Sequence, residues 1–86
     1  MDAIEDQVAR EQVEYKQRQF FSRLNVLDAV KSGVGLEAAI DALPDKETGL
    51  ICWHWLQAIE FYTTKSAPKE AARAEKARKL VLEKIR

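Results

Sequence analysis

The sequence predicts an all-α protein, a small irregular bundle of three to four helices that forms a single helical domain over residues 1–86. Three glycines and two prolines are too few for the many turns of an all-β fold. Alanine, leucine, glutamate, glutamine, lysine and arginine dominate the chain, and all of them favour helix. Apolar residues make up 47% of the sequence, which is typical of a folded domain and too high for a disordered one.

The longest helix is predicted over residues 2–32, which contain no glycine or proline. At helical pitch its apolar residues fall on two faces, formed by Ala9, Val13, Phe20, Leu24 and Leu27, and by Ile4, Val8, Tyr15 and Val26. A helix that packs only against its own domain usually needs one apolar stripe. Two stripes therefore predict a second contact, and another copy of the chain is the leading candidate. The first turns are very polar, so we expect them to fray or to project from the body.

Two short turn sequences divide the middle of the chain. The sequence SGVG at 32–35 ends the first helix because glycine adopts backbone conformations that other residues avoid. A short helix is predicted over 36–43, with one apolar face formed by Leu36, Ala39, Ile40 and Leu43. Pro44 cannot continue that helix, and Asp45 is placed to cap the free amides of the next one.

A third helix is predicted over residues 46–65, and it is apolar on nearly all sides, which is typical of a central helix. About half its circumference is interpreted as core: Ile51, Cys52, Trp55, Leu56, Ala58, Ile59 and Tyr62. Leu50, Trp53 and Phe61 lie on the other side, beside Gln57. This second face is core if the first helix covers it. If it is exposed, it is an interaction surface, because exposed apolar patches usually mark one.

The last helix is predicted to start at the turn SAP (66–68) and to run to about the C-terminus. Its inward face is expected to hold Ala71, Ala74, Ala77, Val81, Leu82 and Ile85. Residues 65–86 carry eight bases and three acids, whereas residues 1–64 carry six bases and eleven acids. The interpretation we favour is that the basic helix lies against acidic parts of the same chain, or of another copy in head-to-tail self-association. Otherwise it binds an acidic partner through Lys69, Arg73, Lys76 and Lys79.

The residues with the most reactive side chains do not form a catalytic or metal site. Cys52 and His54 are the only cysteine and histidine, and side chains two positions apart on a helix point in divergent directions. We therefore expect a non-enzymatic protein without cofactor or metal. A single cysteine, no recognisable secretory signal and no membrane-spanning apolar run predict a cytoplasmic location.

These observations lead to a protein–protein interaction module, a small adaptor, inhibitor or regulator that forms a homodimer. A bacterial, phage or other mobile-element origin is a guess from its size and style and does not follow from these observations. Its partner-binding residues are predicted to be Leu50, Trp53, Gln57, Phe61, Lys69, Arg73, Lys76 and Lys79. The alternative is a nucleic-acid-binding regulator. It would use a divergent helix-turn-helix at 39–53 or the basic C-terminal helix.

Overall fold

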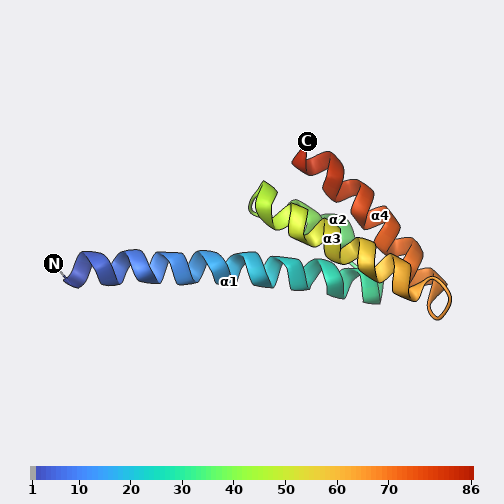
Figure 1. Ribbon diagram of the computed structural model, residues 1–86, viewed down its shortest axis with the longest axis horizontal. Helices are drawn as coiled ribbons and strands as arrows, with labels where there is room; N and C mark the ends of the chain where they lie inside the picture. Colours follow the sequence, from blue (N-terminus) through green and yellow to red (C-terminus); the bar gives the residue numbers. More distant parts are fainter. Residues whose placement is uncertain (1) are drawn as a thin grey trace.

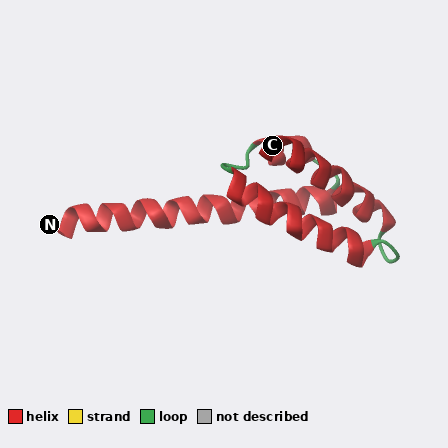
Figure 2. Cartoon of the chain, turned by 45° about the horizontal axis from the view of Figure 1, so that its top comes forward, coloured by secondary structure: helices red, strands yellow, loops and turns green. Residues whose placement is uncertain are grey.

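The computed structural model describes residues 2–86, and this part of the chain folds into helices without strands (Figures 1 and 2). The helices are α1 (Asp2–Ser32), α2 (Leu36–Asp41), α3 (Lys46–Thr63) and α4 (Pro68–Ile85). The prediction of an all-α fold is confirmed, and each helix ends within two residues of its predicted bounds. Side-chain surroundings are described from residue 5 onward.

The protein is elongated because only the C-terminal third of α1 belongs to the bundle. The molecule measures 56 × 25 × 20 Å along its principal axes, and the N-terminal part of α1 extends away from the other helices (Figure 1). From residue 5 to residue 21 every α1 side chain except Gln19 is exposed. The expectation that the first turns project from the body is therefore confirmed.

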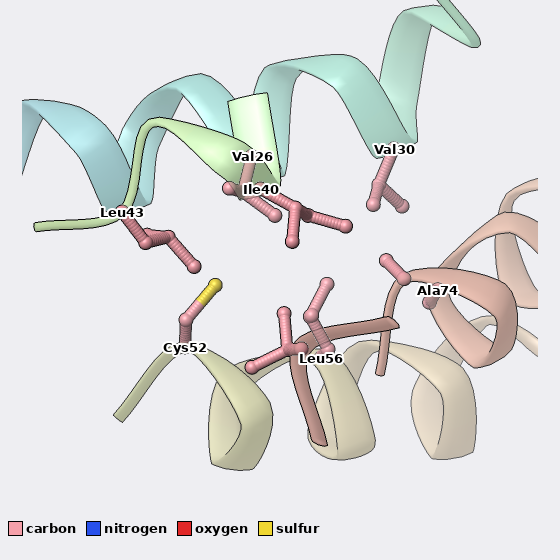
Figure 3. Close-up of a cluster of buried hydrophobic side chains, with 9 residues drawn as sticks. Val26, Val30, Ile40, Leu43, Cys52, Leu56 and Ala74 are labelled. Atoms are coloured by element: carbon pink, nitrogen blue, oxygen red, sulfur yellow. The ribbon is translucent and has the colours of Figure 1, made fainter. Parts of the chain in front are cut away.

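One hydrophobic core joins the four helices (Figure 3). Its fully enclosed members come from every helix and from the loop before α3: Val26, Val30, Ile40, Leu43, Cys52, Leu56, Ala74, Ala77 and Val81. Each buried valine or leucine side chain contributes roughly 1.5–3 kcal/mol relative to an exposed one. The predicted inward faces of α2 and α4 supply most of these residues, and only Leu82 of the predicted α4 face remains exposed.

Small residues bring α3 and α4 close together. Ala71, Ala74 and Ala77 recur every three residues on the buried side of α4. Near the C-terminal end of α4 the small residue is Gly49 of α3, where a Cβ atom would come within 2.5 Å of the Ile85 Cγ2 methyl. The absence of a side chain at Gly49 therefore sets the distance between the two helices.

The turns form as the sequence predicts. Gly33 and Gly35 both have positive φ angles, 79° and 73°, which L-residues rarely adopt, and they carry the chain from α1 into α2. The Asp45 carboxylate caps α3 by accepting a hydrogen bond from the Thr48 amide at 2.7 Å.

Candidate protein-interaction surfaces

The predicted binding face of α3 divides into a covered part and an open part. Trp53 packs against the core, and the Arg78 guanidinium of α4 lies over its indole ring at 5.8 Å from the centroid. Four residues spaced by helical turns stay exposed and form what we call the α3 outer face: Leu50, His54, Gln57 and Phe61. Leu50 is 50% exposed and Phe61 76% exposed. Trp53 is the covered residue of the predicted face. The helix that covers it is α4, whereas the sequence suggested α1.

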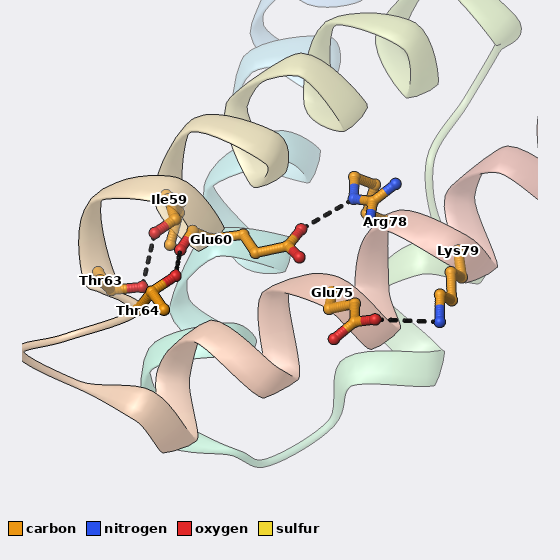
Figure 4. A network of polar contacts seen from close by, with 7 residues as sticks. All are labelled: Ile59, Glu60, Thr63, Thr64, Glu75, Arg78 and Lys79. Atoms are coloured by element: carbon orange, nitrogen blue, oxygen red, sulfur yellow. Dashed lines mark hydrogen bonds and ion pairs between the residues drawn. The ribbon is translucent and has the colours of Figure 1, made fainter.

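A shallow hollow adjoins the C-terminal end of this face. Gln57, Glu60, Phe61 and Thr64 of α3 line it together with Arg78 of α4. Arg78 Nε donates to Glu60 Oε2 at 2.9 Å, and both side chains are about three-quarters buried, which fixes the position of the pair (Figure 4). The hollow therefore combines an aromatic side chain with a positioned ion pair, a mixture that is common at the centres and rims of protein interfaces.

Two aromatic residues that the sequence predicts as core are not core, so that prediction is wrong. Tyr62 is 77% exposed and Trp55 is 37% exposed. Trp55 lies against α1, where the Arg23 guanidinium stacks over its ring at 5.1 Å. Helical periodicity groups residues that share a face, but it does not reveal how far the neighbouring helices extend along that face. Tyr62 lies in the last turn of α3, where the packed part of the bundle ends.

The positive charges of α4 are largely engaged within the protein. Arg73 donates hydrogen bonds to the carbonyl oxygens of Val30 and Lys31, at the end of α1. Lys84 donates hydrogen bonds to the carbonyl oxygens of Ile40 and Asp41, at the end of α2. Carbonyls in the last turn of a helix have no partner inside the helix and carry partial negative charge, so two cations of α4 stabilise two helix ends. The amino-acid sequence does not reveal this role, because it depends on where the helices lie relative to one another.

The remaining predicted contacts on α4 lie at the surface. Lys69 is exposed, and Lys79 pairs with Glu75 one turn earlier at 3.1 Å. Lys76 lies 3.9 Å from Glu37 of α2. Exposed pairs of this kind contribute little to stability, so these lysines remain free to exchange partners. Of the eight predicted binding residues, the structure brings Gln57 and Phe61 together at the hollow, and it gives Arg73 a structural role.

Asp45 links α3 to the projecting helix. Its carboxylate accepts hydrogen bonds from the Tyr15 hydroxyl and, at 3.2 Å, from the Gln19 side-chain amide. The Tyr15 hydrogen bond, reinforced by those from Thr48 and Gln19, lowers the pKa of Asp45 from 3.8 to about 2. The same contact raises the pKa of Tyr15. These bonds mark the point beyond which α1 leaves the bundle.

The only cysteine and histidine point apart, as the sequence predicts. Cys52 is completely buried in the core, and burial raises the pKa of its thiol from 9.0 to about 11. A thiol held in its protonated form is a poor nucleophile. His54 is exposed on the α3 outer face. Among the side chains described, those of residues 5–86, we find no group of three or more histidine, cysteine, aspartate or glutamate residues arranged to hold a metal ion.

No helix within the described part of the chain has both the length and the apolar character needed to cross a membrane. Comparison of the sequence with protein-family models and with curated proteins, and of the structure with solved structures, finds no match. The surfaces described above are therefore the basis for a functional proposal.

Proposed function

We propose that this protein is a non-enzymatic interaction module, a small adaptor or inhibitor that binds a protein partner through the α3 outer face. The observation that carries the proposal is the exposure of Leu50 and Phe61 on one face of α3, the helix whose Cys52 and Leu56 are buried in the core. A leucine or phenylalanine side chain gains roughly 1.5–3 kcal/mol when it is fully buried. A partner that covers both residues would recover that free energy.

The face is rigid, which favours binding. Asp45 caps the start of α3, the core holds Cys52 and Leu56, and the close packing at Gly49 fixes the helix against α4. A surface that is ordered before binding loses little conformational entropy in the complex. Three exposed lysines lie on neighbouring α4: Lys69, Lys76 and Lys79. They would raise the association rate of an acidic partner more than they would raise its affinity.

The nucleic-acid alternative receives less support from the arrangement of charges. Phosphate binding depends on the number of free cations, and Arg73, Arg78 and Lys84 already bond to other parts of the chain, which leaves Lys69, Lys76 and Lys79 as the exposed cations on α4.

A pair of adjacent aromatic residues allows a matched test of the proposal. Phe61 and Tyr62 are equally exposed, at 76% and 77%, but they point about 100° apart around α3. Tagged wild-type protein, Phe61→Ala and Tyr62→Ala are used to capture partners from the native host. The partner that Phe61→Ala fails to retain is then purified and titrated calorimetrically against all three proteins.

We expect Phe61→Ala to weaken binding of that partner roughly tenfold or more, and Tyr62→Ala to leave it nearly unchanged. Both substitutions replace exposed side chains, so neither should lower helix content in circular dichroism. Equal affinity of Phe61→Ala and wild type for every captured protein would contradict the proposal.

A further inference from the structure

The projecting part of α1 has an apolar lane on the side that its own bundle leaves open. Two shallow depressions lie on this part of the helix and share Val13. One continues past Ala9 toward Asp6, and the other continues past Lys16 to Phe20. Val13 is 54% exposed and Phe20 45% exposed, so both apolar side chains face water in the single chain.

The lane has the residue spacing of a helix that pairs with another helix. Its residues alternate at steps of three and four: Asp6, Ala9, Val13, Lys16, Phe20 and Arg23. This alternation keeps side chains on one side of a helix and lets them fit between those of a partner. We call these six residues the α1 lane.

We propose that two copies of this chain pair through their α1 lanes in an antiparallel arrangement, with the two-fold axis between Glu14 and Tyr15. This register sets Ala9 opposite Phe20 of the partner and Phe20 opposite Ala9 of the partner. A small residue then faces a large one in both outer apolar layers, which is how facing helices fill the space between them. Val13 meets the alkyl stem of the partner's Lys16, whose ammonium group reaches water.

The charges of the α1 lane select the antiparallel orientation. In that orientation Asp6 of each chain lies beside Arg23 of the partner, and opposite charges meet at both ends of the contact. In a parallel pair each residue meets its own copy, so Asp6 would face Asp6, Lys16 would face Lys16, and Arg23 would face Arg23. Like charges at the same level repel one another. A parallel pair would also stack Phe20 on Phe20 and leave Ala9 opposite Ala9.

Arg23 is available for this contact within the single chain. Its guanidinium is held against the Trp55 ring, and no carboxylate of the described residues forms an ion pair with it. Its Nε atom is buried, so a carboxylate of another chain would reach the terminal nitrogens of the guanidinium and not Nε. The partner's Asp6 would place a carboxylate next to a guanidinium that the fold has already positioned.

The charges of α1 residues outside the α1 lane also favour the antiparallel orientation. Residues 5–14 contain four carboxylates and one arginine, whereas residues 15–23 contain three bases and no carboxylate. An antiparallel pair lays each segment along the oppositely charged segment of the partner, and a parallel pair lays it along an identical one. The pairing leaves the α3 outer face open, so it does not depend on the proposed function.

The first experiment measures association through the α1 lane. Sedimentation equilibrium over a range of protein concentrations should show a monomer–dimer equilibrium for the wild type. Phe20→Ala should raise the dissociation constant of the dimer roughly tenfold or more. The substitution removes one phenylalanine from each copy, and so the large side chain from both outer apolar layers. Val8→Ala is the control, since Val8 is 47% exposed on the same projecting part of α1 but lines neither depression, and it should leave the constant nearly unchanged.

The second experiment measures orientation. A spin label on Glu5→Cys reports the distance between the two copies, because Cys52 is buried and does not react in the folded protein. The antiparallel register separates the two labels by about 30 Å along the helices. A parallel pair would bring them to about 10 Å, the spacing of packed helices.

Three results would overturn the proposal. The first is a monomer at every concentration, and the second is a dimer that Phe20→Ala does not weaken. The third is the short label distance. Loss of partner capture by Phe61→Ala has no bearing on any of them, so failure of this proposal and failure of the proposed function can be told apart.

Discussion

The two parts of α1 have the same secondary structure and opposite surroundings. In residues 22–32 the side chains of Ser22, Val26, Ala29 and Val30 are buried, whereas in residues 5–21 almost every side chain is exposed. Both parts contain apolar residues at helical spacing, so composition does not separate them. The two parts differ because the chain returns to α1 only near Asp45, the residue that caps α3. The hydrogen bonds of Asp45 with Tyr15 and Gln19 are the last contacts along α1 toward its N-terminus.

This contrast separates two sources of stability. The bundle is stabilised by burial of side chains from four helices in one core. The projecting part has no such core and depends on helix propensity, which is marginal for isolated helices, and on any partner it binds. Substitutions in the two parts should therefore have very different effects.

The largest effect is expected for Leu56→Ala, because Leu56 is the largest completely buried side chain. Removing it leaves a cavity and should lower the free energy of unfolding by about 2–5 kcal/mol. Urea denaturation followed by circular dichroism measures this change. A loss well below that range would mean that the core can collapse around the smaller side chain, and the contrast with the projecting part would be weaker than we propose.

Gly49→Ala should come next, because the added methyl would meet the Ile85 Cγ2 methyl. Overpacking of this kind costs typically 1–3 kcal/mol, and the better helix propensity of alanine offsets up to about 1 kcal/mol of it. We expect a net loss of stability in the same denaturation experiment. Adding Ile85→Ala to Gly49→Ala makes space for the new methyl and should recover part of the lost stability. If Gly49→Ala alone is more stable than the wild type, α4 shifts away from α3 without cost and the prediction is wrong.

Asp45→Ala tests the boundary between the two parts. It removes the cap of α3 and the acceptor for Tyr15 and Gln19, and loss of a cap costs typically about 1 kcal/mol. Asp45→Asn keeps an acceptor for the Thr48 amide and should retain most of the cap. Thermal denaturation at neutral pH should therefore place Asp45→Asn between Asp45→Ala and the wild type.

The same carboxylate gives a pH dependence of known sign. Its pKa is about 2 in the folded protein and 3.8 ordinarily, so the folded state binds the proton less readily than the unfolded state. The stability it contributes is present above the ordinary pKa and is lost as the pH falls through the folded value. Between these pH values the wild type should lose stability more steeply than Asp45→Asn, and parallel pH profiles would contradict this role.

The smallest effect is expected for Val8→Ala in the projecting part, outside the α1 lane. Val8 is 47% exposed and packs into no core, and alanine is the better helix former. The free energy of unfolding should stay within about 0.5 kcal/mol of the wild type. A loss that approaches that of Leu56→Ala would show that this side chain is buried in solution, and the contrast within α1 would not hold.

The local structure of this protein follows from short-range features of its sequence. The turn residues at 32–35, Pro44 and the Asp45 cap act within a few residues, and so the bounds of all four helices follow from nearby sequence. The burial of Cys52 and of the α4 alanines was also predictable, because one face of a helix repeats with the helical period.

Which apolar face of a helix meets a neighbour depends instead on how the helices pack in three dimensions. This packing covers Trp53 with Arg78, leaves Phe61 and Tyr62 in water, and stops the coverage of α1 at Tyr15. It also directs Arg73 and Lys84 of a basic helix to the carbonyl ends of α1 and α2. Periodicity identifies residues that lie on one side of a helix, but burial depends on contacts between residues that are distant in the sequence, and those exist only once the helices have packed.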